Sequence, residues 1–171
     1  MRRLAWEDFV EGAVESYGPH PVTREEIIAF AAQFDPQPMH LDEEAAKTTM
    51  LGGLGASGWH TGAVCMRYLI TYRQRLVEAR RAHGEPVARS GPSPGFRDLR
   101  WIKPVYAGDT LTFATEVLTT RVTQSRPGWG LATSLNSGTN QNGDLVYSFE
   151  GAVFVERRPG WDATQTKRPP L

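Results

Sequence analysis

The chain has 171 residues, and its 19 lysine and arginine residues equal its 19 aspartate and glutamate residues, so the formal net charge is zero. This length suits a single domain, and the balanced charge argues against a nucleic-acid-binding protein, which usually has a basic excess. The one cysteine, Cys65, excludes an intramolecular disulfide framework and any zinc site built from several cysteines of one chain.

The start of the chain, MRRLAWEDFVEG, is basic, but no apolar segment follows it, so we expect no signal peptide. Nowhere does the sequence approach the ~20 consecutive apolar residues that span a membrane. We therefore expect a cytoplasmic protein that has neither a membrane nor a nucleic acid as its partner.

The first predicted elements are a strand and a helix. Loose alternation predicts a strand around Phe9–Tyr17. Thr23 and Glu26 form a capping box, which predicts that a helix begins directly after Thr23. That helix is expected to end at Phe34, because Pro36 disfavours a helical backbone in the residue before it.

Two more helices are predicted before the middle of the chain. Asp42 is the expected N-cap of a short helix, and the glycine-rich turn LGGLGASG follows. From Trp59 the apolar residues recur at helical spacing, which predicts a buried helix. Its charged second half, RQRLVEARRAHG, is expected to emerge into solvent and to end near Gly84. The composition of residues 84–95 indicates a loop.

The second half of the chain changes to the period of strands. Strands are predicted over Phe96–Lys103, Thr110–Thr123, Trp129–Asn140 and Asp144–Glu156, with turns at Gly108-Asp109 and Asn142-Gly143. In the last strand, alternation places one set of apolar residues on a single face: Leu145, Tyr147, Phe149, Val153 and Val155.

This order of elements predicts an α+β fold in which helices lie on one side of an antiparallel sheet. We expect one domain over residues 1–156 and a flexible, polar tail over residues 157–171. The sheet is large and the helices are few, so a partner subunit is expected to cover or extend one face of the sheet.

The stretch DPQPMHLD, which starts at Asp35, contains the strongest chemical signal. On a helix, Asp35 and His40 would lie roughly 140° apart around the axis. Two prolines instead predict a stiff, non-helical bend that can turn both side chains toward one point. A preorganised pair of this kind suits general acid–base catalysis, which contributes ~10²–10⁴-fold in rate.

Two other interpretations of this stretch stay open on spacing alone. An aspartate before proline at a helix end is common turn chemistry, and a histidine in a loop is usually a surface residue. A metal site built from Asp35, His40, Asp42 and His60 is disfavoured, because their spacing matches no known ligand pattern. We expect no metal.

Together these residues resemble the MaoC-like acyl dehydratase and (R)-specific enoyl-CoA hydratase family. D-P-Q-P-x-H, then LDEEAA, then a small-residue turn is similar to the family's D-x-N-P-x-H-x-D motif and its A-H-G helix opening. LRWIKPVYAGDTL is similar to the family's K-P-V-x-x-G-D segment. The resemblance covers roughly residues 20–156. It implies a hot-dog fold, in which a curved antiparallel sheet wraps a long central helix, usually as a homodimer.

The resemblance also implies an activity in fatty acid metabolism. Water would add reversibly across the 2,3 double bond of an acyl thioester of coenzyme A or of acyl carrier protein. Asp35 and His40 would be the catalytic pair, and the backbone N–H of Gly58 would bind the thioester oxygen. No cofactor is implied, because coenzyme A is part of the substrate.

This chain departs from the family pattern at several positions near the expected site. Gln37 replaces the usual asparagine, Ser57 replaces the histidine of A-H-G, and Ala63 replaces a serine of many hydratases. Gln37, Ser57, Trp59 and His60 are therefore candidates for the substrate pocket. For Trp59 a core or interface role is an equal alternative, and for His60 first-turn packing is favoured.

Other motifs carry weaker signals. Gly53 to Gly58 fit G-x-G-x-x-G, but a dinucleotide site needs a preceding strand, and here a polar helical segment precedes the glycines. Cys65 is interpreted as a small hydrophobe. Phosphate contacts are possible for a basic set on the first strand of the second half, although solvent exposure is favoured: Arg97, Arg100 and Lys103.

Two rival functions remain at this stage. A thioesterase of the same fold would cleave the thioester and release a free thiol. A non-enzymatic acyl-CoA-binding subunit would bind without turnover, as the absence of the A-H-G histidine and the helix serine suggests.

Overall fold

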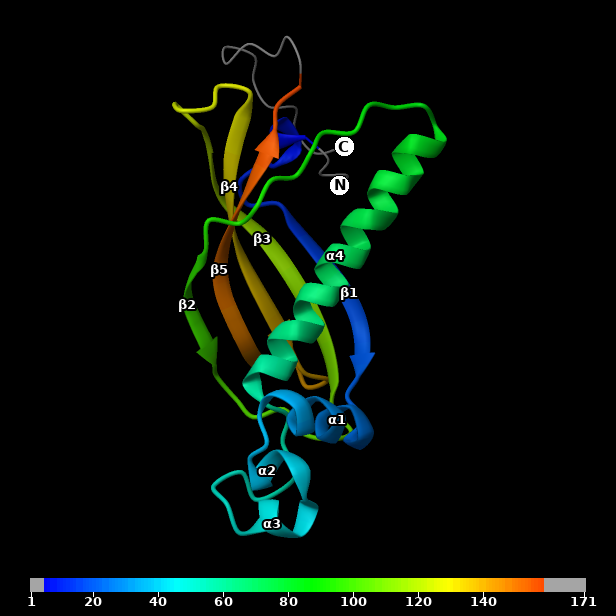
Figure 1. Cartoon of the computed structure of the whole chain (residues 1–171), viewed down its shortest axis with the longest axis vertical. Coiled ribbons are helices and arrows are strands. Elements are labelled where there is room, and N and C mark those ends of the chain that lie inside the picture. The colour runs from blue at the N-terminus through cyan, green and yellow to red at the C-terminus, as the bar shows by residue number, and fades with distance from the viewer. Residues whose placement is uncertain (1–4, 159–171) are drawn as a thin grey trace.

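A curved five-stranded antiparallel sheet and one long helix dominate the computed structural model, which describes residues 5–158 (Figure 1). The strands, in chain order, are β1 (Val14–Pro21), β2 (Phe96–Trp101), β3 (Thr110–Val122), β4 (Trp129–Thr139) and β5 (Leu145–Glu156). The helices are η1 (Trp6–Asp8), α1 (Arg24–Phe34), α2 (Pro38–Leu41), α3 (Glu43–Lys47) and α4 (Gly58–Ala82). The order in the sheet is β1-β3-β4-β5-β2, which makes β1 and β2 the edge strands.

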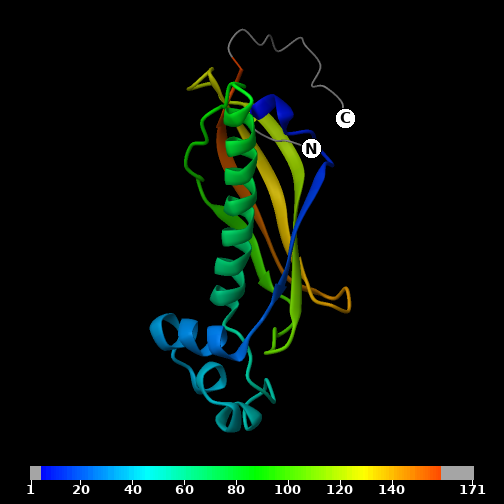
Figure 2. The ribbon, with the colours of Figure 1, turned by 90° about the vertical axis from the view of Figure 1, so that its right-hand side faces the viewer.

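Figure 2 shows that α4 lies along one face of the sheet, while α1, α2 and α3 gather beyond its N-terminal end. The predicted α+β class, with a curved sheet around a long helix, is confirmed. Val64, Cys65 and Leu69 of α4 are buried against Phe113 and Tyr147 of the sheet, among others. The apolar half of α4 therefore anchors it, and its N-terminus meets the three short helices.

The first strand begins later than the sequence predicted. The segment around Phe9–Tyr17 was expected to form it, but β1 runs from Val14 through Pro21. Prolines 19 and 21 fit in β1 because it is an edge strand, where a missing N–H leaves no partner unpaired. Phe9 instead packs under the sheet beside η1 in a second small core.

The capping box is present as predicted. The Thr23 hydroxyl accepts a hydrogen bond from the Glu26 N–H, and the Glu26 carboxylate accepts one from the Thr23 N–H. The helix that they begin, α1, ends at Phe34. The predicted short helix after Asp42 is also present, with the Asp42 carboxylate accepting from the Ala45 N–H at 2.7 Å.

The prediction of a non-helical bend across DPQP was wrong at its last residue. Pro38 occupies the first position of the one-turn helix α2, and His40 lies inside it. Proline suits this position, because the first N–H groups of a helix have no intrahelical partner and its φ is already helical. The stiffening therefore comes from a short helix as well as from the bend at Pro36.

The predicted alternation in β5 fails at its start. Leu145 is exposed, whereas Val146 and Tyr147 are both buried. The pairing shows why: Leu145 pairs with Thr139 and Tyr147 with Gly138, so Val146 is an extra residue in a β-bulge. The bulge turns two successive side chains inward near the N-terminus of α4.

The C-terminal segment is only partly described. Arg157 and Arg158 contact η1, where the Arg158 N–H donates to the buried carboxylate of Glu7. Residues 159–171, which carry the rest of the predicted flexible tail, lie outside the described residues. Within residues 5–158, no helix combines the length and apolarity that crossing a membrane requires.

Candidate active site

The two side chains of the Asp-His motif lie close together between α1 and α4. Asp35 is the residue directly after α1, and its backbone N–H donates to the carbonyl of Ala31. His40 lies in α2, and its Nε2 is 3.6 Å from Asp35 Oδ2. The His40 side chain is 8% exposed and that of Asp35 is 20% exposed. Both groups are thus shielded, although a small molecule can still reach the carboxylate.

The second nitrogen of His40 is held by the glycine-rich turn. His40 Nδ1 lies 2.7 Å from the carbonyl oxygen of Gly55. A carbonyl only accepts hydrogen bonds, so Nδ1 must carry a hydrogen. In neutral His40 the lone pair is therefore on Nε2, and it faces Asp35.

This tautomer determines what fits between the two groups. Neutral Nε2 and the Asp35 carboxylate are both acceptors, so they cannot hydrogen-bond to each other. A water molecule can donate one hydrogen to each of them. The pair is therefore suited to hold a water and to remove one of its protons through Nε2.

Two donors fix the Asp35 carboxylate. The Ser57 hydroxyl donates to Oδ2 at 2.6 Å, and the Gln37 amide donates to Oδ1 at 2.7 Å. These bonds, that of Ser57 first, lower the pKa of Asp35 below its ordinary 3.8. Asp35 therefore stays charged at neutral pH, and two of the candidate pocket residues act on it directly.

Ser57 also joins Asp35 to the start of α4. It is buried at 1% exposure, caps α4, and its hydroxyl oxygen accepts from the Trp59 N–H at 3.3 Å. One hydroxyl thus contacts both the catalytic candidate and the helix N-terminus. The position that carries a different residue in the family pattern still supports the carboxylate here.

The N-terminus of α4 borders the same space as His40. Gly58 and His40 both line a cavity of about 310 Å³, together with residues of the segment after β2, among them Ile102, Lys103, Pro104 and Val105. Gly58 is the first residue of α4, so its N–H has no acceptor within the helix and lies at the positive end of the helix dipole. An oxygen that gains negative charge would be stabilised there.

Trp101 is the site residue that sequence reasoning missed. Its indole ring covers Gly58 so closely that a Cβ atom at position 58 would overlap it. Trp101 also packs edge-on against Trp59, with ring centroids 5.2 Å apart. Its place next to the motif K-P-V-x-x-G-D was the available signal. Its contact with α4 could not be predicted, because the order of elements along the chain does not say which residue of β2 packs on the helix.

Trp59 and His60 lie in different surroundings. Trp59 is 55% exposed and lines a second cavity of about 510 Å³ with Phe34 and Met66. His60 is buried and stacks on Phe30, with centroids 4.9 Å apart, and burial lowers its pKa. His60 thus packs between α1 and α4 and does not line the cavity beside His40.

The four residues of the metal hypothesis are not brought together. Asp42 caps α3 and His60 stacks on Phe30, while only Asp35 and His40 are neighbours. Among residues 5–158, no three His, Cys, Asp or Glu side chains gather closely enough to hold a metal ion.

The glycine-rich match, Cys65 and two residues of the basic set all have structural roles. Gly55 of the G-x-G-x-x-G match provides the carbonyl that holds His40, and the element directly before this turn is the helix α3, not a strand. Cys65 is buried, and desolvation raises its pKa to about 12, which disfavours the reactive thiolate. Arg97 pairs with Glu150 and Lys103 with Asp144.

Several known proteins are similar to this chain. Residues 8–129 match the family described as MaoC like domain. Uncharacterized protein YdeM of Bacillus subtilis (strain 168) is 31% identical over 151 residues, which cover 88% of this chain and 98% of YdeM.

Solved structures give the same result. A MaoC-like dehydratase from Rhodospirillum rubrum is 36% identical, with a TM-score of 0.75, over 91% of this chain and 99% of that one. R-Hydratase PhaJ1 from Pseudomonas aeruginosa is 23% identical, with a TM-score of 0.63, over 98% of this chain and 95% of that one. The second likeness shows the fold alone.

Proposed function

The chain belongs to the MaoC-like domain family, which confirms the resemblance and the hot-dog fold, and from this premise we propose that it is an acyl-thioester hydratase or dehydratase. The reaction is the reversible addition of water across the 2,3 bond of an enoyl thioester. The acyl group is carried by coenzyme A or by a carrier protein. A second copy of the chain is the expected partner subunit.

Asp35 and His40 handle the water in this proposal. The water donates to His40 Nε2 and to the Asp35 carboxylate, which leaves its oxygen free to attack C3 of the enoyl group. His40 takes a proton from the water as the new carbon–oxygen bond forms. The pair then returns a proton to C2, so that the elements of one water molecule are added.

The thioester oxygen gains negative charge as C3 is attacked. The Gly58 N–H at the start of α4 would donate to it. In other enzymes one such donor contributes about 2.7–4 kcal/mol to transition-state stabilisation. The cavity of about 310 Å³ that His40 and Gly58 share gives the thioester a place between base and donor.

A single observation carries the proposal. His40 Nε2 faces Asp35 at 3.6 Å, while its Nδ1 is fixed by the Gly55 carbonyl at 2.7 Å. A surface histidine or an ordinary turn aspartate would need neither contact. If Asp35 were only a turn residue and His40 only a surface residue, the fixed orientation of the His40 ring toward Asp35 would have no explanation.

The direct test uses Asp35→Asn and His40→Ala with crotonyl-CoA or a related enoyl thioester. Hydration, followed by loss of the enoyl absorbance, is expected to fall by at least ~10²-fold in each variant. His40→Ala removes the base, and Asp35→Asn removes the carboxylate charge and turns one acceptor oxygen into an amide donor. His83→Ala is the control, since His83 is exposed at the far end of α4. Full activity in either site variant would exclude this mechanism.

The same assay separates the rivals. A thioesterase would release free coenzyme A, which a thiol reagent detects. A binding subunit would retain the thioester with neither hydration nor thiol release. Hydration without thiol release is the result that the proposal requires.

A further inference from the structure

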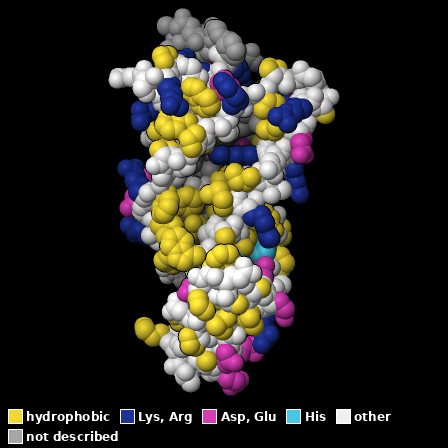
Figure 3. All heavy atoms as spheres, in the orientation of Figure 1, with side chains coloured by type: hydrophobic (Ala, Val, Ile, Leu, Met, Phe, Trp, Pro, Cys, Tyr) yellow, Lys and Arg dark blue, Asp and Glu magenta, His cyan; other side chains and the backbone are white. Residues whose placement is uncertain are grey.

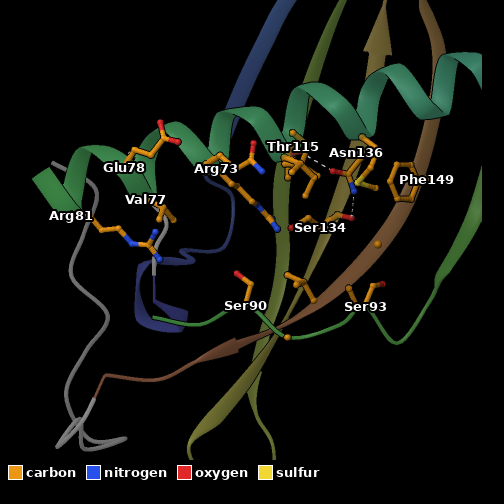
Figure 4. A pocket seen from close by; sticks show the side chains of 18 residues that line it. Arg73, Val77, Glu78, Arg81, Ser90, Ser93, Thr115, Ser134, Asn136 and Phe149 are labelled. Atoms are coloured by element: carbon orange, nitrogen blue, oxygen red, sulfur yellow. Dashed lines mark hydrogen bonds between the residues drawn. The ribbon is translucent and has the colours of Figure 1, made fainter. Parts of the chain in front are cut away.

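A third cavity, of about 690 Å³, lies deeper along α4 than the catalytic candidates. It is bounded by α4, by the inner face of β4 and β5, and by the loop that carries Ser90 and Ser93 (Figure 4). Its volume falls within the ~300–1,000 Å³ of typical small-molecule sites. Apolar side chains such as Leu69 and Phe149 form much of its wall.

Polar residues also line the cavity. Six of them belong to α4 and to the loop before β2: Arg73, Gln74, Glu78, Arg81, Ser90 and Ser93. The other three lie on the sheet. Thr115, Ser134 and Asn136 point from β3 and β4 toward the cavity, and all three are at least 94% buried. The Thr115 hydroxyl donates to the Asn136 amide oxygen at 2.8 Å, and the Asn136 amide nitrogen lies 3.4 Å from the carbonyl of Ser134. A sheet face that packs on a helix normally carries apolar side chains at such positions.

The hydrogen bonds of this trio are incomplete. Within the described residues, the Ser134 hydroxyl has no hydrogen-bond partner, and the Asn136 amide has a second N–H to donate. Within residues 5–158 the Ser134 hydroxyl is not one of the fully enclosed side-chain atoms that lack a partner, so it is open to the cavity. The free groups are donors at the cavity wall, and an oxygen atom of a ligand would satisfy them.

The cavity continues toward the catalytic candidates. Met66 and Phe149 line both this cavity and that of about 510 Å³, which also contacts Trp59 and Phe34. Phe34 directly precedes Asp35 in the chain. At ~1.5 Å rise per residue, the eight steps from Gly58 to Met66 span about 12 Å along α4. The cavities of about 310 Å³ and 510 Å³ share no lining residue, so an acyl chain whose thioester lies at Gly58 would pass the Trp59–Trp101 pair before it follows α4 into the third cavity.

We propose that this cavity binds the distal part of the acyl chain, and that the preferred substrate is an enoyl thioester with an apolar body and a hydroxyl or carbonyl oxygen near its far end. The proposal rests on the hydratase function proposed above. Ser134 and Asn136 donate to that oxygen and so determine specificity.

The test compares pairs of 2-enoyl-CoA thioesters of increasing chain length, one with a terminal methyl group and one with a terminal hydroxyl or keto group. Crotonyl-CoA is too short to reach the cavity and reports on the catalytic site alone. The variant is Ser134→Ala, which keeps the shape and removes the unpaired hydroxyl. The control is Ser137→Ala, because Ser137 lies on the opposite face of β4 by strand alternation.

For the wild type, kcat/KM is expected to be higher for the oxygenated member of a long-chain pair. Ser134→Ala is expected to reduce that preference about threefold to tenfold, the value of one ordinary hydrogen bond, and to leave crotonyl-CoA turnover unchanged. Ser137→Ala is expected to behave as the wild type. Equal turnover of both members of every pair, or a preference that survives Ser134→Ala, would overturn the specificity proposal and leave hydration of crotonyl-CoA intact.

Calorimetric binding of the saturated, unreactive pairs keeps the two proposals separate. If no enoyl thioester is hydrated but the saturated oxygenated chain still binds more tightly and loses that advantage in Ser134→Ala, the cavity assignment is supported and the hydratase function fails. If neither saturated chain is preferred, the cavity assignment fails whatever the catalytic result.

Discussion

At the scale of single residues, the charge of Asp35 depends on donors from two different segments. Ser57 contacts it from the start of α4 and Gln37 from two positions along the same bend. Both bonds strengthen the ionised form, so the folded-state pKa lies below the ordinary value of 3.8. A carboxyl with a lowered pKa stabilises the folded state above its ordinary pKa, and this stabilisation is lost as the pH falls through the folded-state pKa.

Ser57→Ala is expected to raise the pKa of Asp35 toward 3.8, because it removes the larger of the two lowering bonds. ¹³C NMR titration of the Asp35 carboxyl measures this pKa. The variant is also expected to be less stable at neutral pH by about 1 kcal/mol, since an N-cap is lost, with a smaller difference in acid. Gln37→Ala is the comparison, and a larger rise in Gln37→Ala than in Ser57→Ala would contradict the assignment.

Gly58→Ala is expected to reduce hydration at least tenfold, because the added Cβ would force the Trp101 ring off the start of α4. Steady-state kinetics with crotonyl-CoA measures the loss, and Trp fluorescence reports the displaced ring. Gly53→Ala is the matched control in the same turn, where a Cβ would meet only Tyr106 at an ordinary 3.9 Å. Unchanged kinetics in Gly58→Ala would remove the basis for a close-fitting N–H donor at this position.

Some of these residue contacts were predictable and some were not. Asp35 and His40 are five positions apart, so local stiffness made their convergence one of the possible interpretations, and the family resemblance favoured it. The bond between Ser57 and Asp35 joins positions 22 apart, and Trp101 of the strand β2 contacts Gly58 at the start of the helix α4. Such contacts depend on how α4 docks on the sheet, which no local pattern contains.

At the scale of elements, the short helix α2 sets the direction of His40. The Asp35 carbonyl accepts from the Gln37 N–H at 2.7 Å across Pro36, and Pro38 then begins α2. Sequence reasoning treated both prolines as helix breakers. It missed that a proline at the first helical position favours a helix, which is why α2 was not predicted.

Pro38→Ala is expected to cost roughly 0.4–1 kcal/mol of stability, because the unfolded chain gains conformational freedom. Hydration is expected to fall severalfold at the same time, since His40 is then less firmly oriented. Denaturant unfolding and crotonyl-CoA kinetics measure the two effects. Pro94→Ala, in the exposed connection before β2, is the control for stability alone. Equal loss of activity in both variants would show that α2 does not position His40.

At the scale of the whole molecule, apolar side chains gather in the space between β2 and the first half of α4 (Figure 3). Phe96 and Trp101 of the edge strand β2 are 61% and 49% exposed, and Met66 of α4 is 44% exposed. The order of strands and helices was predictable from the change of hydrophobic period. The register of β2 against β5 was not, because it follows from long-range pairing.

A second copy of the chain would cover this surface and pair with the free edge of β2, so we expect a homodimer with twice the 19.0 kDa mass of one chain. Phe96→Glu is expected to yield a monomer, because an unpaired charge would be buried at the interface. Light scattering after size exclusion measures the mass. Val14→Glu is the control, since Val14 is similarly exposed, at 58%, on the opposite edge strand β1. A monomeric wild type, or dissociation caused by Val14→Glu and not by Phe96→Glu, would show that β2 and α4 do not form the contact between subunits.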